Sequence, residues 1–123
     1  MRLIRAFLID RDERFVRQFA EQLEQTGEIV VVGHSTRGEQ ALQQIQRLKP
    51  DALFLDIHLP GMSGMELVQR VRENGDLFVV YVTGDKHLAI EAFSQKATDY
   101  LLKPVDEDRL HRAADRLRRL NNQ

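Results

Sequence analysis

Short apolar runs and amphipathic segments alternate along this chain of 123 residues. Apolar runs typical of strands that are buried on both faces occupy residues 4–9, 29–32, 52–56, 77–83 and 98–102. Each run is followed by a segment with apolar residues at helical spacing, in residues 12–25, 37–48, 64–73, 86–95 and 106–120. Five strands alternating with five helices predict an α/β protein with a doubly wound parallel sheet, right-handed crossovers and helices on both faces.

Polar and turn-forming residues mark the ends of several predicted helices. Asp12 is a candidate N-cap for the first helix, and Gly27 suits its C-terminal turn. The helix over 86–95 is the weakest, with an apolar side made of Leu88, Ala89, Ala92 and Phe93. The last helix is predicted to face the core through Leu110, Ala113, Leu117 and Leu120. We therefore expect one domain over residues 1–120, followed by a polar tail or the start of a linker at 121–123.

Composition excludes several classes of function. Apolar residues make up 42% and charged residues 30% of the chain, as in soluble globular proteins. The net charge of −1 gives no reason to expect direct contact with nucleic acid or with an anionic membrane surface. The absence of cysteine excludes a disulfide framework, a thiol nucleophile and a cysteine-ligated metal. The apolar run near the amino terminus is too short to cross a membrane, and we expect a cytoplasmic protein.

Chemically active residues lie where the predicted strands end. Asp10 and Asp12 follow the first strand, Asp56 ends the third, Thr83 ends the fourth and Lys103 follows the fifth. Because parallel strands bring their carboxyl ends to one edge of a sheet, these side chains should converge. Carboxylates are hard ligands for Mg²⁺, and a lysine offsets the charge of a transferring phosphoryl group. A carboxylate can also attack that group to form an acyl phosphate, so the pattern favours phosphoryl chemistry.

Four motifs carry a resemblance to a known family. They are the acidic cluster at 10–13, Asp56 with the loop Leu59-Pro60-Gly61-Met62-Ser63-Gly64, the triplet Val82-Thr83-Gly84, and the stretch Asp99-Tyr100-Leu101-Leu102-Lys103-Pro104. With these four motifs in this order, the chain resembles the receiver domain of two-component response regulators over essentially its full length. The stretches 89–93 and 99–104 are most similar to receivers coupled to LytTR-type DNA-binding domains. The resemblance implies a flavodoxin-like sheet with strand order 2-1-3-4-5 in three layers, α/β/α.

The same resemblance implies roles at the predicted site. Asp56 would accept a phosphoryl group from the phosphohistidine of a sensor histidine kinase, and Lys103 would contact a phosphoryl oxygen. Magnesium would be held by Asp10, Asp12, Asp56 and the main-chain carbonyl of His58. The bond between Lys103 and Pro104 lies where the family often has a cis peptide bond.

A switch and its partners are implied as well. The Thr83 hydroxyl would turn toward the phosphoryl group, and Tyr100 would then move inward. This movement would alter the face formed by helix 86–95, strand 98–102 and helix 106–120. Through that face the chain would control a C-terminal DNA-binding output domain or form a homodimer. The chain is thus expected to be a signalling module rather than a turnover enzyme.

Arg11 departs from the family pattern. The family usually has two adjacent acids after the first strand, the second of which binds the metal, and Arg11 occupies that second position. Arginine carries a permanent positive charge and cannot ligate a metal. Either the loop shifts so that Asp12 supplies the missing carboxylate, or Arg11 pairs with Asp56 and occupies the cation site itself. We expect weakened Mg²⁺ binding, with phosphorylation slowed or lost.

Two other functions compete with a phosphorylated receiver. In a degenerate receiver, Arg11 would replace the metal and protein contacts alone would regulate the domain. In a phosphatase similar to the haloacid dehalogenases, Asp10 and Asp12 would form the Asp-x-Asp nucleophile motif, but Asp56 would then have no role. Asp10 and Asp12 are also compatible with simple helix capping.

The remaining charged residues have simpler interpretations. Four histidines show no metal-ligand spacing and are expected at the surface or in packing, at positions 34, 58, 87 and 111. Four arginines form one stripe of the last helix, at positions 109, 112, 116 and 119, and predict a solvated face or an interaction surface.

Overall fold

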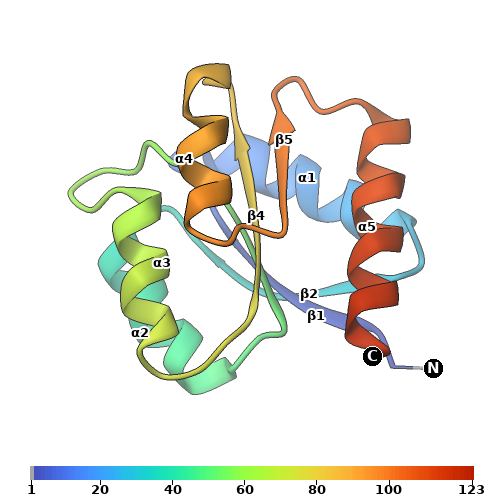
Figure 1. Ribbon diagram of the computed structural model, residues 1–123, viewed down its shortest axis with the longest axis horizontal. Coiled ribbons are helices and arrows are strands. Elements are labelled where there is room, and N and C mark those ends of the chain that lie inside the picture. The colour runs from blue at the N-terminus through green and yellow to red at the C-terminus, as the bar shows by residue number, and fades with distance from the viewer. Residues whose placement is uncertain (1) are drawn as a thin grey trace.

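The sheet has five parallel strands in the order β2-β1-β3-β4-β5. A computed structural model describes residues 2–123 (Figure 1). The strands are β1 (Ile4–Ile9), β2 (Ile29–Ser35), β3 (Ala52–Leu55), β4 (Phe78–Thr83) and β5 (Asp99–Leu102). The helices are α1 (Glu13–Gln25), α2 (Gly38–Leu48), α3 (Gly64–Arg72), α4 (Ala89–Ser94) and α5 (Glu107–Asn121), with a 3₁₀ turn, η1 (Lys86–Leu88), before α4. The predicted α/β class, parallel sheet and strand order are confirmed.

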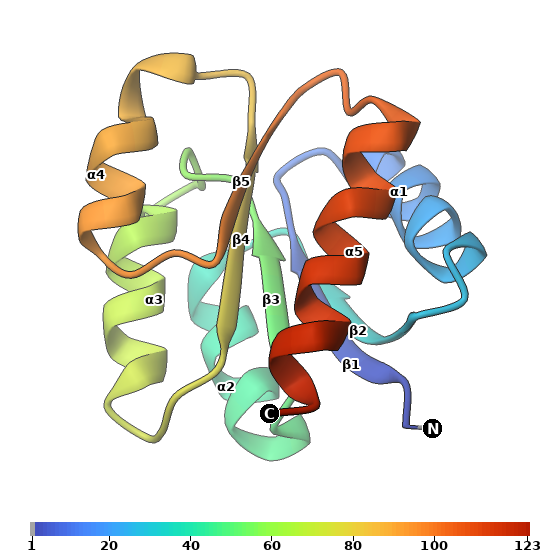
Figure 2. The ribbon, with the colours of Figure 1, turned by 45° about the vertical axis from the view of Figure 1, so that its right-hand side comes forward.

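Helices cover the sheet on both faces, which gives three layers (Figure 2). Alternate residues of β1 point to opposite faces, as the period of a strand requires. Ala6 and Leu8 pack with α1 and α5, whereas Phe7 and Ile9 pack with α2, α3 and α4. Both cores are apolar, so polar side chains with a chemical role are left to the ends of the strands.

Side-chain caps mark the starts of several helices, and the cap that the sequence predicts, Asp12, is confirmed. Asp12 is the N-cap of α1, and its carboxylate accepts hydrogen bonds from the amides of Arg14 and Phe15. Ser63 caps α3 and Asp106 caps α5 in the same manner. The peptide bond between Lys103 and Pro104 is cis.

The segment after β4 differs most from the prediction. Instead of one helix over 86–95, η1 precedes an α4 of only 6 residues. Phe93, expected on the packed side, is 53% exposed, and Ile90 is 84% exposed. A short helix needs few buried side chains, and only Ala92 of α4 is fully buried.

Smaller differences concern the ends of elements. Strand β2 continues to Ser35, beyond the predicted end near residue 33, because pairing with β1 extends to Ile9. Leu120, expected to face the core, is only half-buried. Helix α5 ends at Asn121, one residue beyond the predicted end at 120.

Candidate functional site

Four of the predicted site residues meet at the carboxyl edge of the sheet. Asp10 follows β1, Asp56 follows β3, Thr83 ends β4 and Lys103 follows β5. They line one open hollow together with Arg11, Asp12, His58, Gly84, Asp85, Lys86, His87 and Leu102. Asp10, Asp56 and Thr83 are buried, at 3%, 7% and 1% exposure. The structure therefore brings together groups that lie far apart in the sequence.

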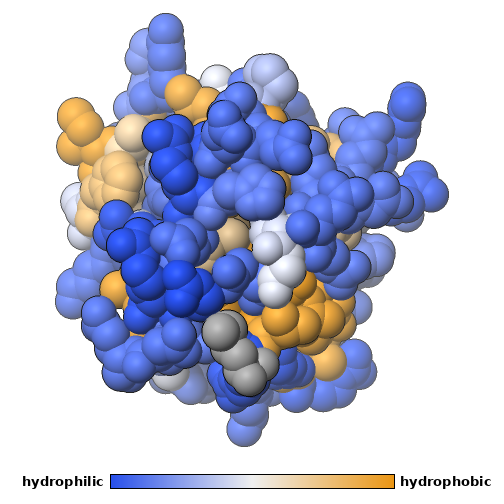
Figure 3. Space-filling view, turned by 90° about the vertical axis from the view of Figure 1, so that its right-hand side faces the viewer, coloured by the Kyte–Doolittle hydropathy of each residue, from blue (hydrophilic) through white to orange (hydrophobic). Residues whose placement is uncertain are grey.

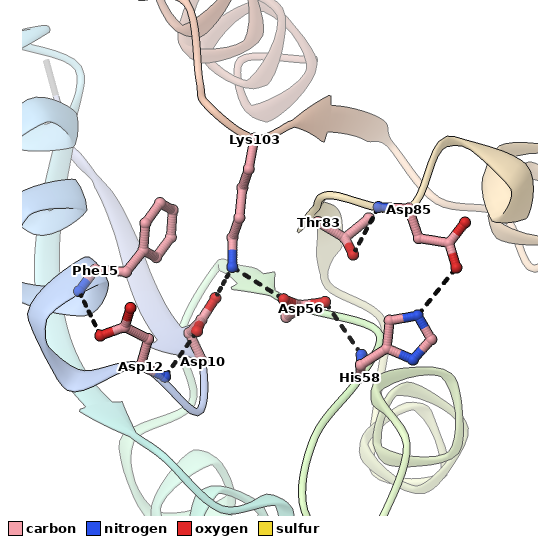
Figure 4. A network of polar contacts seen from close by, with 8 residues as sticks. All are labelled: Asp10, Asp12, Phe15, Asp56, His58, Thr83, Asp85 and Lys103. Carbon is pink, nitrogen blue, oxygen red and sulfur yellow. Dashed lines mark hydrogen bonds and ion pairs between the residues drawn. The ribbon is translucent and has the colours of Figure 1, made fainter.

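Lys103 is the cation shared by the two buried acids (Figure 4). Its Nζ donates to Asp10 Oδ2 at 2.6 Å and to Asp56 Oδ2 at 2.9 Å. The same nitrogen lies 4.3 Å from the centre of the Phe15 ring on α1, which adds a cation–π contact. Lys103 thus compensates two carboxylates that burial alone would make costly to ionise.

The pKa values of the pair follow from this arrangement. Burial would raise the pKa of Asp56, but hydrogen bonds from Lys103, the His58 amide and Thr83 together hold that pKa below 3.8. Burial would lower the pKa of Lys103, but Asp10 and Asp56 together raise it above 10.5. Asp56 is therefore ionised at neutral pH, as an attacking carboxylate must be.

The loop after Asp56 is held close to its backbone. The Asp56 amide donates to the carbonyl of Ile9 at 3.0 Å, and the His58 amide donates to Asp56 Oδ1 at 3.1 Å. The Gly64 amide donates to the carbonyl of Ile57 at 2.7 Å. A Cβ atom on Gly64 would lie 2.3 Å from the carbonyl oxygen of Asp56, so only glycine permits this approach.

Asp12 and Arg11 line the hollow, but neither side chain forms an ion pair or hydrogen bond with Lys103. The Asp12 carboxylate caps α1, and its amide donates to Asp10 Oδ1 at 2.9 Å. Arg11 is exposed, and within residues 2–123 no ion pair joins it to Asp56 or to another acid. The cation beside Asp56 in this structure is Lys103, not Arg11.

The site also includes Asp85, which the sequence analysis did not assign, and the side chain of His58, of which only the carbonyl was assigned. His58 Nε2 lies 3.0 Å from Asp85 Oδ2, which joins the loop after β3 to the loop after β4 (Figure 4). The Asp85 amide donates to the Thr83 hydroxyl at 3.4 Å. The role expected for the His58 carbonyl, as a metal ligand, did not indicate a role for the His58 side chain. Nothing in the sequence around Asp85 indicates a partner 27 residues away.

Tyr100 already points inward in this structure. It is 9% exposed, and its hydroxyl donates to the main-chain carbonyl of Asp85. Its ring centre lies 6.5 Å from that of Tyr81. Burial raises the pKa of Tyr100, and the charges of Asp85 and Asp56 raise it further. The residue expected to move inward thus contacts the loop that follows Thr83.

The arginine stripe of α5 is only partly a solvated face. Arg109 forms an ion pair with the buried Asp99 of β5, and Arg119 pairs with Asp115. Arg112 and Arg116 are exposed, and the side of the molecule that carries α5 and the two termini is mainly hydrophilic (Figure 3). In the part of the chain that the structure describes, no helix has the length and apolarity needed to span a bilayer.

The oxygen donors at the hollow suit a hard cation. Asp10 and Asp56 supply two buried carboxylates, and His58, the expected carbonyl ligand, lines the same hollow. Mg²⁺ commonly binds through one or two carboxylates and keeps several waters, so this set fits it. Among residues 2–123, however, no three acidic or histidine side chains are grouped as a metal site. The carboxylate of Asp12, the third expected acid, caps α1.

Comparisons with known proteins agree with the geometry. The family model of the response regulator receiver domain matches residues 6–115. A response regulatory protein of Vibrio cholerae is 44% identical over 118 residues, which cover 95% of this chain and 49% of that protein. The sensory transduction protein LytT of Oceanobacillus iheyensis is 35% identical over 116 residues, which cover 91% of this chain and 47% of LytT.

A solved structure matches over the whole fold. The response regulatory domain of protein mrkE from Klebsiella pneumoniae superposes with a TM-score of 0.90 at 28% identity, covering 98% of this chain and 100% of that one. The chain spans about half the length of the curated relatives it matches.

Proposed function

The chain belongs to the response regulator receiver domains, and from this premise we propose that it is a phosphoacceptor switch in which Asp56 takes a phosphoryl group from a sensor histidine kinase. The observation that carries the proposal is the contact of Lys103 Nζ with Asp10 and Asp56, at 2.6 and 2.9 Å. This contact keeps a buried carboxylate ionised and supplies a cation beside the reacting oxygen. The domain signals by shifting between two states rather than by turning over a substrate.

The transfer step uses groups at the hollow. An Asp56 carboxylate oxygen attacks the phosphorus atom, the bond between phosphorus and the kinase histidine nitrogen breaks, and that nitrogen keeps the electron pair. Lys103 offsets the charge on the phosphoryl oxygens, and the Thr83 hydroxyl donates a hydrogen bond to one of them. Asp10, Asp56 and the His58 carbonyl would hold magnesium, which would neutralise further charge on the phosphoryl oxygens.

The response is passed on through the face formed by α4, β5 and α5. Tyr100 lies on β5 with its hydroxyl on the loop that follows Thr83, so a shift of Thr83 bears on Tyr100. The exposed side chains of Ile90, Phe93 and Leu102, which we call the α4–β5 apolar surface, lie on this face. We assign this surface to a second copy of the chain, and a C-terminal DNA-binding domain to the remaining half seen in relatives such as LytT.

The two alternatives are less well supported. In a degenerate receiver, Arg11 would occupy the cation site, but Lys103 is the residue that pairs with Asp56. In a phosphatase, Asp12 would act on substrate, but its carboxylate caps α1, and Asp56 would be left without a role.

Labelling of Asp56 tests the proposal directly. The domain is incubated with acetyl phosphate and Mg²⁺ and its intact mass is measured, and beryllofluoride binding is followed by NMR. We expect a phosphoryl adduct and shifted amides around Asp56, Thr83 and Lys103, with both lost in Asp56→Asn. If the native domain gives neither signal, the phosphoacceptor function is wrong.

Magnesium titration tests the part played by Arg11. An arginine near the two carboxylates repels a dication, so Arg11→Asp should tighten Mg²⁺ binding by about tenfold, which corresponds to about 1.4 kcal/mol. Arg14→Asp, which makes the same charge change on the exposed surface of α1, is the matched control. Sub-millimolar affinity in the native domain would contradict weakened binding.

A further inference from the structure

Asp85 makes more contacts than any role assigned so far requires. Its carboxylate lies 3.0 Å from His58 Nε2 through Oδ2 and accepts the His87 amide at 2.9 Å through Oδ1. Its amide donates to the Thr83 hydroxyl, and its carbonyl accepts the Tyr100 hydroxyl. One residue thus touches the acceptor loop, the hydroxyl at the site, the start of η1 and the inward tyrosine.

The contact between His58 and Asp85 joins two loops that line the hollow. His58 belongs to the loop between β3 and α3, and Asp85 belongs to the loop between β4 and η1 (Figure 4). The amide of His58 donates to Asp56 Oδ1, so one end of this contact is anchored on the acceptor itself. The other end is the residue whose carbonyl holds Tyr100.

We propose that Asp85 is a positioning residue which, through its contact with the His58 side chain, fixes the loop after β4 and holds Tyr100 in its buried position. We call the contact between His58 and Asp85 the strap. Its meaning for signalling rests on the phosphoacceptor function proposed above, whereas its effect on Tyr100 does not.

The strap acts by biasing a balance between two positions of Tyr100. The side chains of His58 and Asp85 are 55% and 28% exposed, so the pair itself is weak and adds little to overall stability. A weak contact still changes the ratio of two nearly equal states severalfold when it exists in only one of them. For Tyr100 this contact acts through its hydroxyl, which donates to the Asp85 carbonyl, in addition to the packing of its ring beside Tyr81.

Fluorine NMR on the two tyrosines of the chain reads this balance. The protein is labelled with 3-fluorotyrosine, Tyr81→Phe assigns the signals, and a soluble paramagnetic probe measures the exposure of each. In the unligated native protein we expect the Tyr100 fluorine signal to be protected from the probe. In His58→Ala and in Asp85→Ser, the probe should relax that signal at least twofold faster. Serine keeps a cap for η1 but is too short to reach His58.

Three comparisons separate positioning from a general structural effect. Asp85→Asn keeps both side-chain contacts and should retain the protected Tyr100 signal. His87→Ala removes a neighbouring imidazole that has no side-chain hydrogen bond in residues 2–123 and should also leave the signal unchanged. Combining His58→Ala with Asp85→Ser should be no worse than either alone, because both remove the same contact. The Tyr81 signal reports whether each variant is folded.

The outcomes are decisive for the strap and separable from the proposed function. An unchanged Tyr100 signal in folded His58→Ala, or equal exposure in Asp85→Asn and Asp85→Ser, overturns the proposal. If Asp85→Ser does not fold, His58→Ala decides alone, because its side chain is largely exposed. Addition of beryllofluoride and Mg²⁺ is a separate arm: failure to bind contradicts the phosphoacceptor function, while the comparison without ligand still tests the strap.

Discussion

Lys103 holds two buried carboxylates in place, so its removal should destabilise the fold in a pH-dependent way. In Lys103→Met, Asp10 and Asp56 lose their shared cation. Because the lysine side chain is 24% exposed, the loss should be about 1–3 kcal/mol of unfolding free energy at pH 7, less than for a fully buried pair. Urea unfolding measures this loss. Lys86→Met, which changes an exposed lysine at the same hollow, should cost less than about 0.5 kcal/mol.

The sign of the pH effect follows from the pKa shifts. In the native protein the pKa of Asp56 is lowered, so its contribution to stability is present above pH 3.8 and is lost as pH falls through the lower folded value. Without Lys103, burial raises the pKa of Asp56 instead. The variant should then gain stability as pH falls from 7 toward 5. Equal destabilisation at pH 7 and pH 5 would show that Lys103 acts through packing alone.

The two tyrosines should resist ionisation in alkali. Burial raises the pKa of Tyr81 to about 12, although the charge of Arg72 opposes this, and burial also raises the pKa of Tyr100. Both values exceed 10.0, so stability is present below pH 10 and is lost as pH rises toward the folded values. Absorbance of tyrosinate at alkaline pH should show less than half ionisation at pH 10 in the folded protein and about half in urea. Half ionisation of the folded protein at pH 10 would contradict the burial of both rings.

Sequence reasoning located some site residues and missed others for a physical reason. Asp10, Asp56, Thr83 and Lys103 could be placed together because the ends of parallel strands share an edge whatever the loops do. The contact between His58 and Asp85 could not be foreseen, because it joins two loops whose shapes depend on the assembled fold. The sequence also could not decide whether Asp12 caps the helix or ligates a metal, since an aspartate at this position can do either.

At the level of elements, the turn from β3 into α3 depends on Gly64. Gly64→Ala would place a Cβ atom 2.3 Å from the carbonyl oxygen of Asp56 and 2.9 Å from Ile57 Cα, both main-chain atoms. The loop must then move, at a cost of about 1–3 kcal/mol in unfolding free energy. Because the loop carries Asp56, the rate of acetyl phosphate labelling should fall as well.

Gly84→Ala is the matched control for that variant. A Cβ atom at Gly84 would meet nothing within 4 Å, and the backbone there does not require glycine. Thermal unfolding and labelling should both stay close to the native values. If the two alanine variants behave alike, the close approach at Gly64 does not determine the position of the acceptor loop.

Elements differed in how well the sequence defined them. Helices α1, α3 and α5 begin within one residue of the prediction, and a capping side chain marks each start. The segment from Lys86 to Ser94 also has a capping side chain, Asp85, but its apolar residues are too numerous for the one side that is buried. Phe93 fits the predicted helical pattern and yet remains exposed, so periodicity alone overestimated the packed side of this helix.

At the scale of the whole molecule, the exposed apolar side chains of α4 are suited to association and are not needed for the stability of the fold. Two cores on opposite faces of the sheet hold the fold together, and neither contains Ile90 or Phe93. Large apolar side chains left outside a core are typical of contact surfaces. A second copy is a suitable partner, because α4 carries the exposed Glu91 and α5 the exposed Arg112 and Arg116, which a twofold axis can pair across an interface.

Ile90→Glu should therefore weaken self-association and leave the fold intact. Because Ile90 is 84% exposed, the substitution should alter the unfolding free energy by less than about 0.5 kcal/mol. Sedimentation velocity over a concentration series, with beryllofluoride and Mg²⁺ present, should show dimerisation of the native domain weakened about tenfold or more in the variant, since a charge would be buried at the contact. Gln43→Glu adds the same charge on the exposed side of α2 and should dimerise like the native domain. If all three proteins sediment as monomers at every concentration, the α4–β5 apolar surface does not bind a second copy. If Gln43→Glu weakens the dimer as much as Ile90→Glu does, the effect is one of net charge and not of the surface.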